Sequence, residues 1–174
     1  MHLDTPRLTL VPSAPVHLLT LIDEPAHFEA RAGQRAAAGL REFFVSDDVS
    51  PQWLAALRQA EGPDPWRHGF FVIHRDSGTI IGSAGFTGPP DSGGTVEIAY
   101  GIVPGFQGQG YATEAAAALV QFAGSSGGVH HVRAHTLPES NASTRVLAKC
   151  GFRHTGTVTD PVDGIVWRWE RDLP

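Results

Sequence analysis

The spacing of hydrophobic and polar positions changes along the chain, and its first part predicts a strand followed by helices. Alternation at Arg7–Pro12 is typical of a short strand, which the proline ends. Helical spacing then appears at Val16–Asp23 and at Ala26–Ala38. A third helix has a clearer start, because Ser50 can cap it and Pro51 fills its first position. The N-terminal part is therefore expected to be one strand followed by three helices.

The middle of the chain changes to strand-like patterns. Three runs rich in β-branched and aromatic residues occur at Gly69–Arg75, Thr79–Phe86 and Val96–Val103. The turn Asp-Ser-Gly between the first two runs predicts a hairpin, and the loop TGPPDSGG leads into the third. These runs are expected to be consecutive strands of one sheet.

Helices and strands alternate in the remainder of the chain. A long alanine-rich helix is expected within Gly105–Gly124, and it is followed by strand, helix, strand and strand at Val129–Thr136, Asn141–Lys149, Phe152–Val158 and Ile165–Glu170. Successive strands followed by alternation predict an α/β fold class, with a mixed sheet that carries helices on its faces. We expect residues 1–174 to form a single domain.

Composition and charge exclude several function classes. The longest apolar run, Ala115–Val120, is too short to cross a bilayer, and the segment Met1–Asp4 lacks the features of a secretory signal. The single cysteine, Cys150, cannot form an internal disulfide, so we expect a cytoplasmic protein without a membrane partner. A formal net charge of −5 argues against a nucleic-acid binder that relies on a broad basic face.

Glycines stand directly before the alanine-rich helix, in the segment Gly105–Gly110 (GFQGQG). Because the first N–H groups of a helix are unpaired and glycine leaves the backbone accessible, this order of residues is suited to a bound phosphate. A Walker loop is excluded, since Tyr111 and Ala112 follow in place of Lys and Ser/Thr. The dinucleotide fingerprint is weakened by Thr113 at its third glycine position. The pattern Arg/Gln-x-x-Gly-x-Gly/Ala fits Gln107–Ala112 completely.

This last pattern resembles the acetyl-CoA pyrophosphate loop of the GNAT superfamily of N-acetyltransferases. Three further segments resemble the ribosomal-protein N-terminal acetyltransferase branch, namely Thr5–Leu10 (TPRLTL), Glu97–Ile102 (EIAYGI) and Gly110–Ala115 (GYATEA). A fourth, Leu137–Phe152, ends in Gly-Phe and resembles the second CoA motif of the family. The resemblance implies the GNAT fold: a central, mixed, largely antiparallel twisted sheet of about seven strands, flanked by helices and splayed between its fourth and fifth strands. The segment at Glu97 corresponds to the fourth strand.

The resemblance also implies acetyl-CoA as the acetyl donor, bound as a cosubstrate. Backbone N–H groups from Gln107 through Ala112 would hold the pyrophosphate, and the edge at Ile102 and Val103 would pair with the pantetheine amides. An N–H near Ile102 would stabilise the oxyanion of the tetrahedral intermediate. The residues implied in cofactor binding are Ile102, Val103, Gln107, Gly108, Gln109, Gly110, Tyr111, Ala112, Thr113, Asn141 and Ser143.

The candidate general base is Glu97. It shares one strand face with Ala99 and Gly101, opposite an apolar row, so it either faces a cleft or is a solvated charge on an exposed face. The topology that the resemblance implies would place His135 beside it, as a second candidate base. The superfamily's usual tyrosine acid falls at Leu147 here, so that acid is excluded; Ser143 stands where the ribosomal-protein branch can use a serine.

These features predict direct acetyl transfer to a primary amine in a ternary complex. The alternative is a non-catalytic acyl-CoA-binding or regulatory module, which the missing tyrosine favours. The acceptor, a protein N-terminus or a small-molecule amine, stays open, as does the choice between monomer and homodimer. We expect no metal site, because His131 and His135 would lie about 13 Å apart on one strand. Aromatic residues in the region that covers the acceptor in this superfamily are Phe28, Phe43, Phe44 and Trp66.

Overall fold

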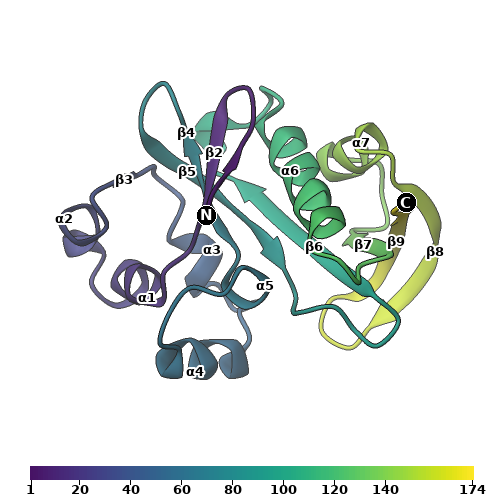
Figure 1. The fold of residues 1–174 in the computed structure, drawn as a ribbon, viewed down its shortest axis with the longest axis horizontal. Helices are drawn as coiled ribbons and strands as arrows, with labels where there is room; N and C mark the ends of the chain where they lie inside the picture. The colour runs from purple at the N-terminus through teal and green to yellow at the C-terminus, as the bar shows by residue number, and fades with distance from the viewer.

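One twisted sheet runs through the computed structural model, which describes all residues 1–174 (Figure 1). Its strand order is β1-β2-β4-β5-β6-β7-β9-β8, and β3 lies beside β5. The longer strands are β2 (Leu8–Pro12), β4 (Phe70–His74), β5 (Thr79–Phe86), β6 (Thr95–Ile102), β7 (His131–Thr136), β8 (Arg153–Asp160) and β9 (Gly164–Asp172). Two-residue strands are β1 (Leu3–Asp4) and β3 (Arg35–Ala36). All pairs are antiparallel except β6–β7 and β3–β5, so the predicted mixed, largely antiparallel sheet is confirmed.

Helices cover this sheet unevenly. They are α1 (Pro15–Asp23), α2 (Phe28–Ala32), α3 (Glu42–Val45), α4 (Pro51–Gln59), α5 (Pro65–His68), α6 (Tyr111–Ser125) and α7 (Ala142–Lys149). Figure 1 shows α6 crossing in front of β6 with α7 beside it, while α1 to α4 lie at the left and lower left of the view, on the other side of the molecule from α7. None of the helices combines the length and the apolar character needed to cross a bilayer.

The helix predicted over Ala26–Ala38 is wrong in extent. A 3₁₀ turn at Pro25–His27 leads into α2, which ends before Gly33. Gly33 has a φ of 70°, the left-handed conformation that closes many helices, and its N–H donates to the carbonyl of Glu29. The chain beyond the glycine then pairs with β5 as the short strand β3.

The sheet opens between β6 and β7. These strands pair in parallel only from Thr95 to Glu97, opposite His131 to Arg133, and diverge beyond that point. This opening is the splay that the resemblance implies between the fourth and fifth strands. We call it the β6–β7 splay.

Backbone groups of β6 are divided between β5 and the splay. The carbonyl of Glu97 accepts the N–H of Thr87, and the N–H of Val103 donates to the carbonyl of Ile81, so the odd-numbered residues pair with β5. Because alternate residues of a strand point their polar groups in opposite directions, the backbone groups of Tyr100 and Ile102 face the splay.

Side chains of β6 also alternate. Val96, Ile98 and Ile102 are buried in the core that α6 covers, whereas Ala99 on the odd-numbered face is exposed. The odd-numbered face looks toward α3, since a Cβ added to Gly101 would lie 2.9 Å from the ring of Phe43. The two faces of β6 therefore meet different helices at the splay.

Candidate active site

The loop before α6 carries an uninterrupted series of unpaired backbone donors. The N–H groups from Gly108 to Thr113 make no hydrogen bond within the chain, and Gly110 offers no side-chain cap to the helix. The first intrahelical bond is donated by Glu114 to the carbonyl of Gly110. Orphaned donors at a helix N-terminus carry partial positive charge, so this loop is suited to an anion.

Two glycines give the loop its shape. Gly108 and Gly110 have φ values of 76° and 86°, a region that other residues avoid. A Cβ added at Gly108 would meet nothing within 4 Å, so the space in front of its backbone is open. The donors are consequently both free and accessible.

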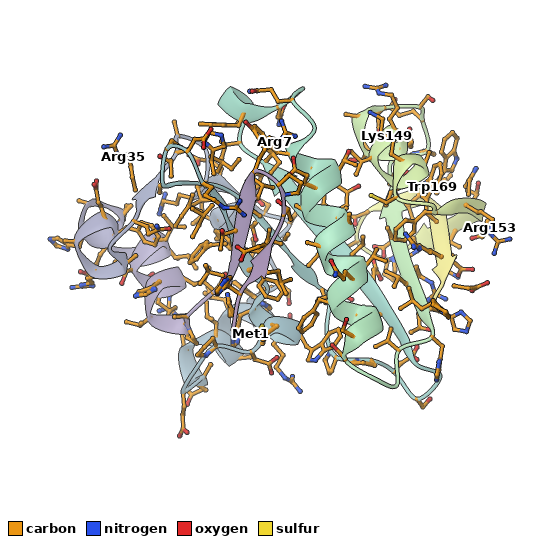
Figure 2. All side chains as sticks on the ribbon, turned by 45° about the horizontal axis from the view of Figure 1, so that its top comes forward. Met1, Arg7, Arg35, Lys149, Arg153 and Trp169 are labelled. Carbon is orange, nitrogen blue, oxygen red and sulfur yellow. The ribbon has the colours of Figure 1, made fainter.

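A cavity of about 460 Å³ joins this loop to the β6–β7 splay. Its walls come from the end of β6, the glycine loop, the start of α6 and one side of α7. Arg145 and Lys149 of α7 add two cationic side chains to the lining. Figure 2 shows Lys149 at the outer end of α7. The free donors and these cations match a pyrophosphate, so the residues present fit the predicted acetyl-CoA.

The structure places most predicted cofactor-binding residues around this cavity. Those that line it are Ile102, Gln107, Gly108, Gly110, Tyr111, Ala112, Thr113 and Ser143. Val103 and Gln109 do not line it, and neither does Asn141.

Three details differ from the predicted contacts. The N–H of Val103 is bonded to β5, so it cannot pair with pantetheine. Asn141 caps α7 instead, since its Oδ1 accepts the N–H of Thr144 at 3.0 Å. The N–H of Gln107 already donates to Pro104, while its side-chain Nε2 donates to the carbonyl of Ile102 at 2.8 Å. The free donors therefore begin at Gly108.

Glu97 and His135 are in contact on the odd-numbered side of the splay. The His135 Nδ1 lies 2.8 Å from Oε1 of Glu97, and Nε of Arg168 lies 3.2 Å from the His135 Nε2. Because a guanidinium only donates, Nε2 of His135 must accept, and the proton of the neutral ring is on Nδ1. That proton is donated to the Glu97 carboxylate. The network therefore links Glu97, His135 and Arg168 through side-chain hydrogen bonds, and Glu97 stays the predicted base.

Tyr100 is a site residue that the sequence reasoning missed. It lies on β6 and lines the cavity together with Ser143. Burial raises the pKa of the Tyr100 phenol and nearby Cys150 adds to the rise, while the Ser143 hydroxyl opposes it. Leu147, at the position of the superfamily's usual tyrosine acid, has no hydroxyl and is buried, with 1% of its surface exposed. The signal was present in the sequence, as Tyr100 is the one residue with a hydroxyl in the apolar row of β6.

The N-terminal segment is tied to the start of α6. Glu114 accepts hydrogen bonds from the Thr5 hydroxyl at 2.7 Å and from the Arg7 N–H at 3.0 Å, and its carboxylate pairs with the Arg7 guanidinium. Arg7 also lies over the Tyr111 ring, 4.3 Å from its centroid, and Figure 2 shows it beside the glycine loop. These contacts hold the helix that carries the free donors.

Replacing Glu114 by glutamine is expected to lower the free energy of unfolding at pH 7 by about 1–3 kcal/mol. Burial raises the pKa of Glu114, but the Thr5 and Arg7 contacts outweigh it and the net pKa is lowered. A lowered pKa stabilises the fold above the unfolded value and loses that effect as the pH falls, so the difference should shrink below about pH 4.3. Urea unfolding at pH 7 and pH 3 tests this, with the exposed Glu61→Gln as control. An equal loss at both pH values would contradict it.

Known proteins share both the sequence pattern and the fold. The acetyltransferase (GNAT) domain model matches residues 7–153. The protein named "Uncharacterized N-acetyltransferase YjdG" from Bacillus subtilis is 29% identical over 64% of this chain and 64% of its own length, so the match spans just under two thirds of that relative. A putative GNAT-family acetyltransferase structure from Bordetella pertussis is 25% identical, covers 98% of this chain and 99% of its own, and has a TM-score of 0.64. Mycobacterium smegmatis RimJ, solved with a CoA disulfide, is 20% identical over 99% of this chain and 86% of its own, with a TM-score of 0.65.

The chain belongs to the GNAT acetyltransferase domain family. Members of this family are acetyltransferases, and the acetyl donor of the family is acetyl-CoA. The predicted family and donor are confirmed, whereas the roles of individual site residues stay predictions.

Proposed function

We propose that this protein transfers the acetyl group of acetyl-CoA directly to a primary amine in a ternary complex. The observation that carries the proposal is the run of free N–H groups from Gly108 to Thr113, which opens onto the β6–β7 splay. A loop used only as a turn would have no need for so many unpaired donors beside a cavity. We further propose that residues 1–174 act as one domain, and that they act in the cytoplasm, as the lone Cys150 suggests.

In this proposal the glycine loop and β6 hold the acetyl donor, acetyl-CoA. The free N–H groups and the Arg145 and Lys149 side chains bind the pyrophosphate. Pantetheine enters the splay, where Ile102 presents its backbone groups. The Ile102 N–H is then the candidate donor to the oxyanion that forms when the amine attacks the thioester carbonyl.

Glu97 is proposed to remove the proton of the attacking amine through water. Glu97 and Gly101 lie four residues apart on one strand face, about 13 Å, which is too far for direct contact with both reaction partners. Ala99 lies between them and is exposed. An amine over Ala99 would have the carboxylate on one side and the thioester on the other, and water can carry the proton over the remaining distance.

Tyr100 and Ser143 are proposed to stabilise the departing thiolate. A thiol of coenzyme A resembles cysteine, with a pKa of about 8.5, so it leaves readily. Since burial raises the pKa of Tyr100, the phenol stays protonated and acts as a hydrogen-bond donor to sulfur. In this proposal Tyr100 and Ser143 take the place of the superfamily's usual tyrosine acid, whose position is occupied by Leu147 here.

We expect Tyr100→Phe to lower kcat by about 10²-fold, because one donor to the developing charge is lost. The KM for acetyl-CoA should change little, since the ring still fills its place. Steady-state kinetics measure both, and Tyr111→Phe is a matched control, because its hydroxyl bonds to His74 rather than reaching the splay. A raised KM with an unchanged kcat would show that Tyr100 only helps to bind the donor.

The function is tested by acetyl-CoA titration calorimetry and by release of free thiol in the presence of amines. Binding followed by amine-dependent thiol release supports the transferase. The second candidate is a non-catalytic acyl-CoA-binding module, which the buried Leu147 at the tyrosine position favours. Binding without thiol release from any amine would favour that candidate, and absence of binding would exclude both.

A further inference from the structure

A second cavity lies on the odd-numbered face of β6, outside the cofactor site. It has a volume of about 390 Å³, within the range of pockets for small molecules. Its walls include the aromatic residues Phe43, Phe44, Trp53 and Phe86. Small residues of β5 and β6, among them Ser83 and Ala99, form its floor.

This cavity borders the place where the reaction is proposed to occur. Ala99 belongs to the second cavity and Gly101 to the cofactor cavity, and the two lie about 7 Å apart along one strand face. Phe43 lines both cavities, and its ring covers Gly101. A molecule in the second cavity therefore reaches the splay beside Phe43. There it would lie next to the end of the cofactor cavity where the thioester of acetyl-CoA is proposed to lie.

The one formal charge that lines this cavity is positive. No aspartate or glutamate lines it, whereas Arg67 and His68 do. Arg67 is only loosely paired, with its Nε 3.3 Å from Asp64 Oδ2 and its side chain 63% exposed. His68 Nδ1 accepts the N–H of Asp64, so its Nε2 carries the proton and is a further donor. A ligand cation inside the cavity would thus find no carboxylate and would face a guanidinium.

Two aromatic residues from the predicted acceptor region do not line the cavity. Phe28 is 1% exposed and packs on Phe71 in the core. Trp66 packs against Phe86 and Phe122, behind the wall. The wall is nonetheless held firmly, because the Trp53 indole donates to the carbonyl of Arg67 at 2.8 Å and its ring stacks on Phe44.

We propose that this cavity binds the acceptor, and that the acceptor is a primary amine on an aromatic or apolar body without a second positive charge. The proposal rests on the proposed acetyl transfer. Apolar walls stabilise a ring in proportion to the area that it buries. A second ammonium group, as in a polyamine or a basic peptide, loses hydration there without gaining a partner. The single reacting amine avoids this cost, since it points to Glu97 at the splay.

The first test compares an aromatic monoamine, a diamine and a basic peptide by release of free thiol from acetyl-CoA. 2-Phenylethylamine is expected to have a kcat/KM at least about tenfold above that of 1,5-diaminopentane or of an arginine-containing tetrapeptide. A higher kcat/KM for the diamine or the basic peptide would overturn the inference and leave the transferase intact. No turnover with any of the three, despite acetyl-CoA binding, would also overturn the inference, whereas the proposed function fails only when no amine at all releases thiol.

The second test adds a carboxylate to the floor. Ser83→Asp is expected to raise the kcat/KM ratio of 1,5-diaminopentane to 2-phenylethylamine by about tenfold, because the distal ammonium gains a partner. Ser125→Asp adds the same charge at an exposed site at the end of α6 and should leave the ratio unchanged. Acetyl-CoA calorimetry on both variants confirms that each is folded. An unchanged ratio in folded Ser83→Asp would show that the acceptor does not occupy this cavity.

Discussion

Glu97→Gln is expected to lower kcat by about 10²- to 10⁴-fold while acetyl-CoA affinity stays nearly constant. Glutamine keeps the shape of the side chain and still accepts the Nδ1–H of His135, but it cannot take up the proton of the amine. The defect should shrink at high pH, because an alkylamine with a pKa near 10.4 then loses its proton to solvent. Stopped-time thiol assays between about pH 6 and pH 10 measure this dependence.

Glu170→Gln supplies the control for this experiment. The Glu170 side chain has the same 33% exposure as Glu97 and forms an ion pair with Arg133 in the same part of the sheet. Glu170 lies on β9, two strands from β6, so its loss should cost stability without the pH-dependent loss of kcat. Equal effects from both substitutions, or a Glu97→Gln enzyme with normal kcat at pH 7, would remove Glu97 as the base.

Gly108→Val is expected to weaken acetyl-CoA binding by about 100-fold or more. Valine at a φ of 76° is strained by about 1–3 kcal/mol, and its side chain would stand in the open space before the free N–H groups. The loop would either refold or keep the pyrophosphate away from its donors. Titration calorimetry with acetyl-CoA reports the loss directly.

A control at Gly78 separates the effect of backbone strain from the effect of lost contact with acetyl-CoA. It has a φ of 65° in the turn between β4 and β5, and an added Cβ there would also meet nothing within 4 Å. Gly78→Val should therefore lower the melting temperature to a similar extent and leave acetyl-CoA affinity unchanged. Comparable affinities for the two variants would mean that the glycine loop is only a turn.

The sequence predicted those elements whose ends are marked by local chemistry. Ser50 caps α4 and accepts the N–H of Trp53, and the helix predicted to begin at Asn141 has that residue as its cap. The region Ala26–Ala38 failed because its helical spacing contains Gly33, and a weak local preference yielded to a left-handed turn and to pairing with β5. Periodicity alone does not reveal such a competition.

Without the resemblance, the residues predicted the candidate site only where it lies along one segment; the placement of His135 beside Glu97 came from the topology that the resemblance implies. The glycine loop is continuous in sequence, so its position and its free donors followed from the order of residues. The contact of Glu97 with His135 needed the strand order, and that of His135 with Arg168 needed the pairing of β7 with β9. Tyr100 was counted with its apolar neighbours, because the nearness of Ser143 depends on how α7 packs over the splay.

Because β6 and β7 pair over only three residues, the hydrogen bonding of the sheet is incomplete at the splay. Beyond Glu97 the strand β6 is an internal edge, and the Gln107 side chain occupies one of its carbonyls, at Ile102, as a ligand amide would. A pantetheine chain entering the splay would replace that glutamine and act as an extra strand between two halves of the sheet. Acetyl-CoA would then be a temporary structural component, and its departure after each turnover would return the enzyme to a looser, incompletely bonded sheet.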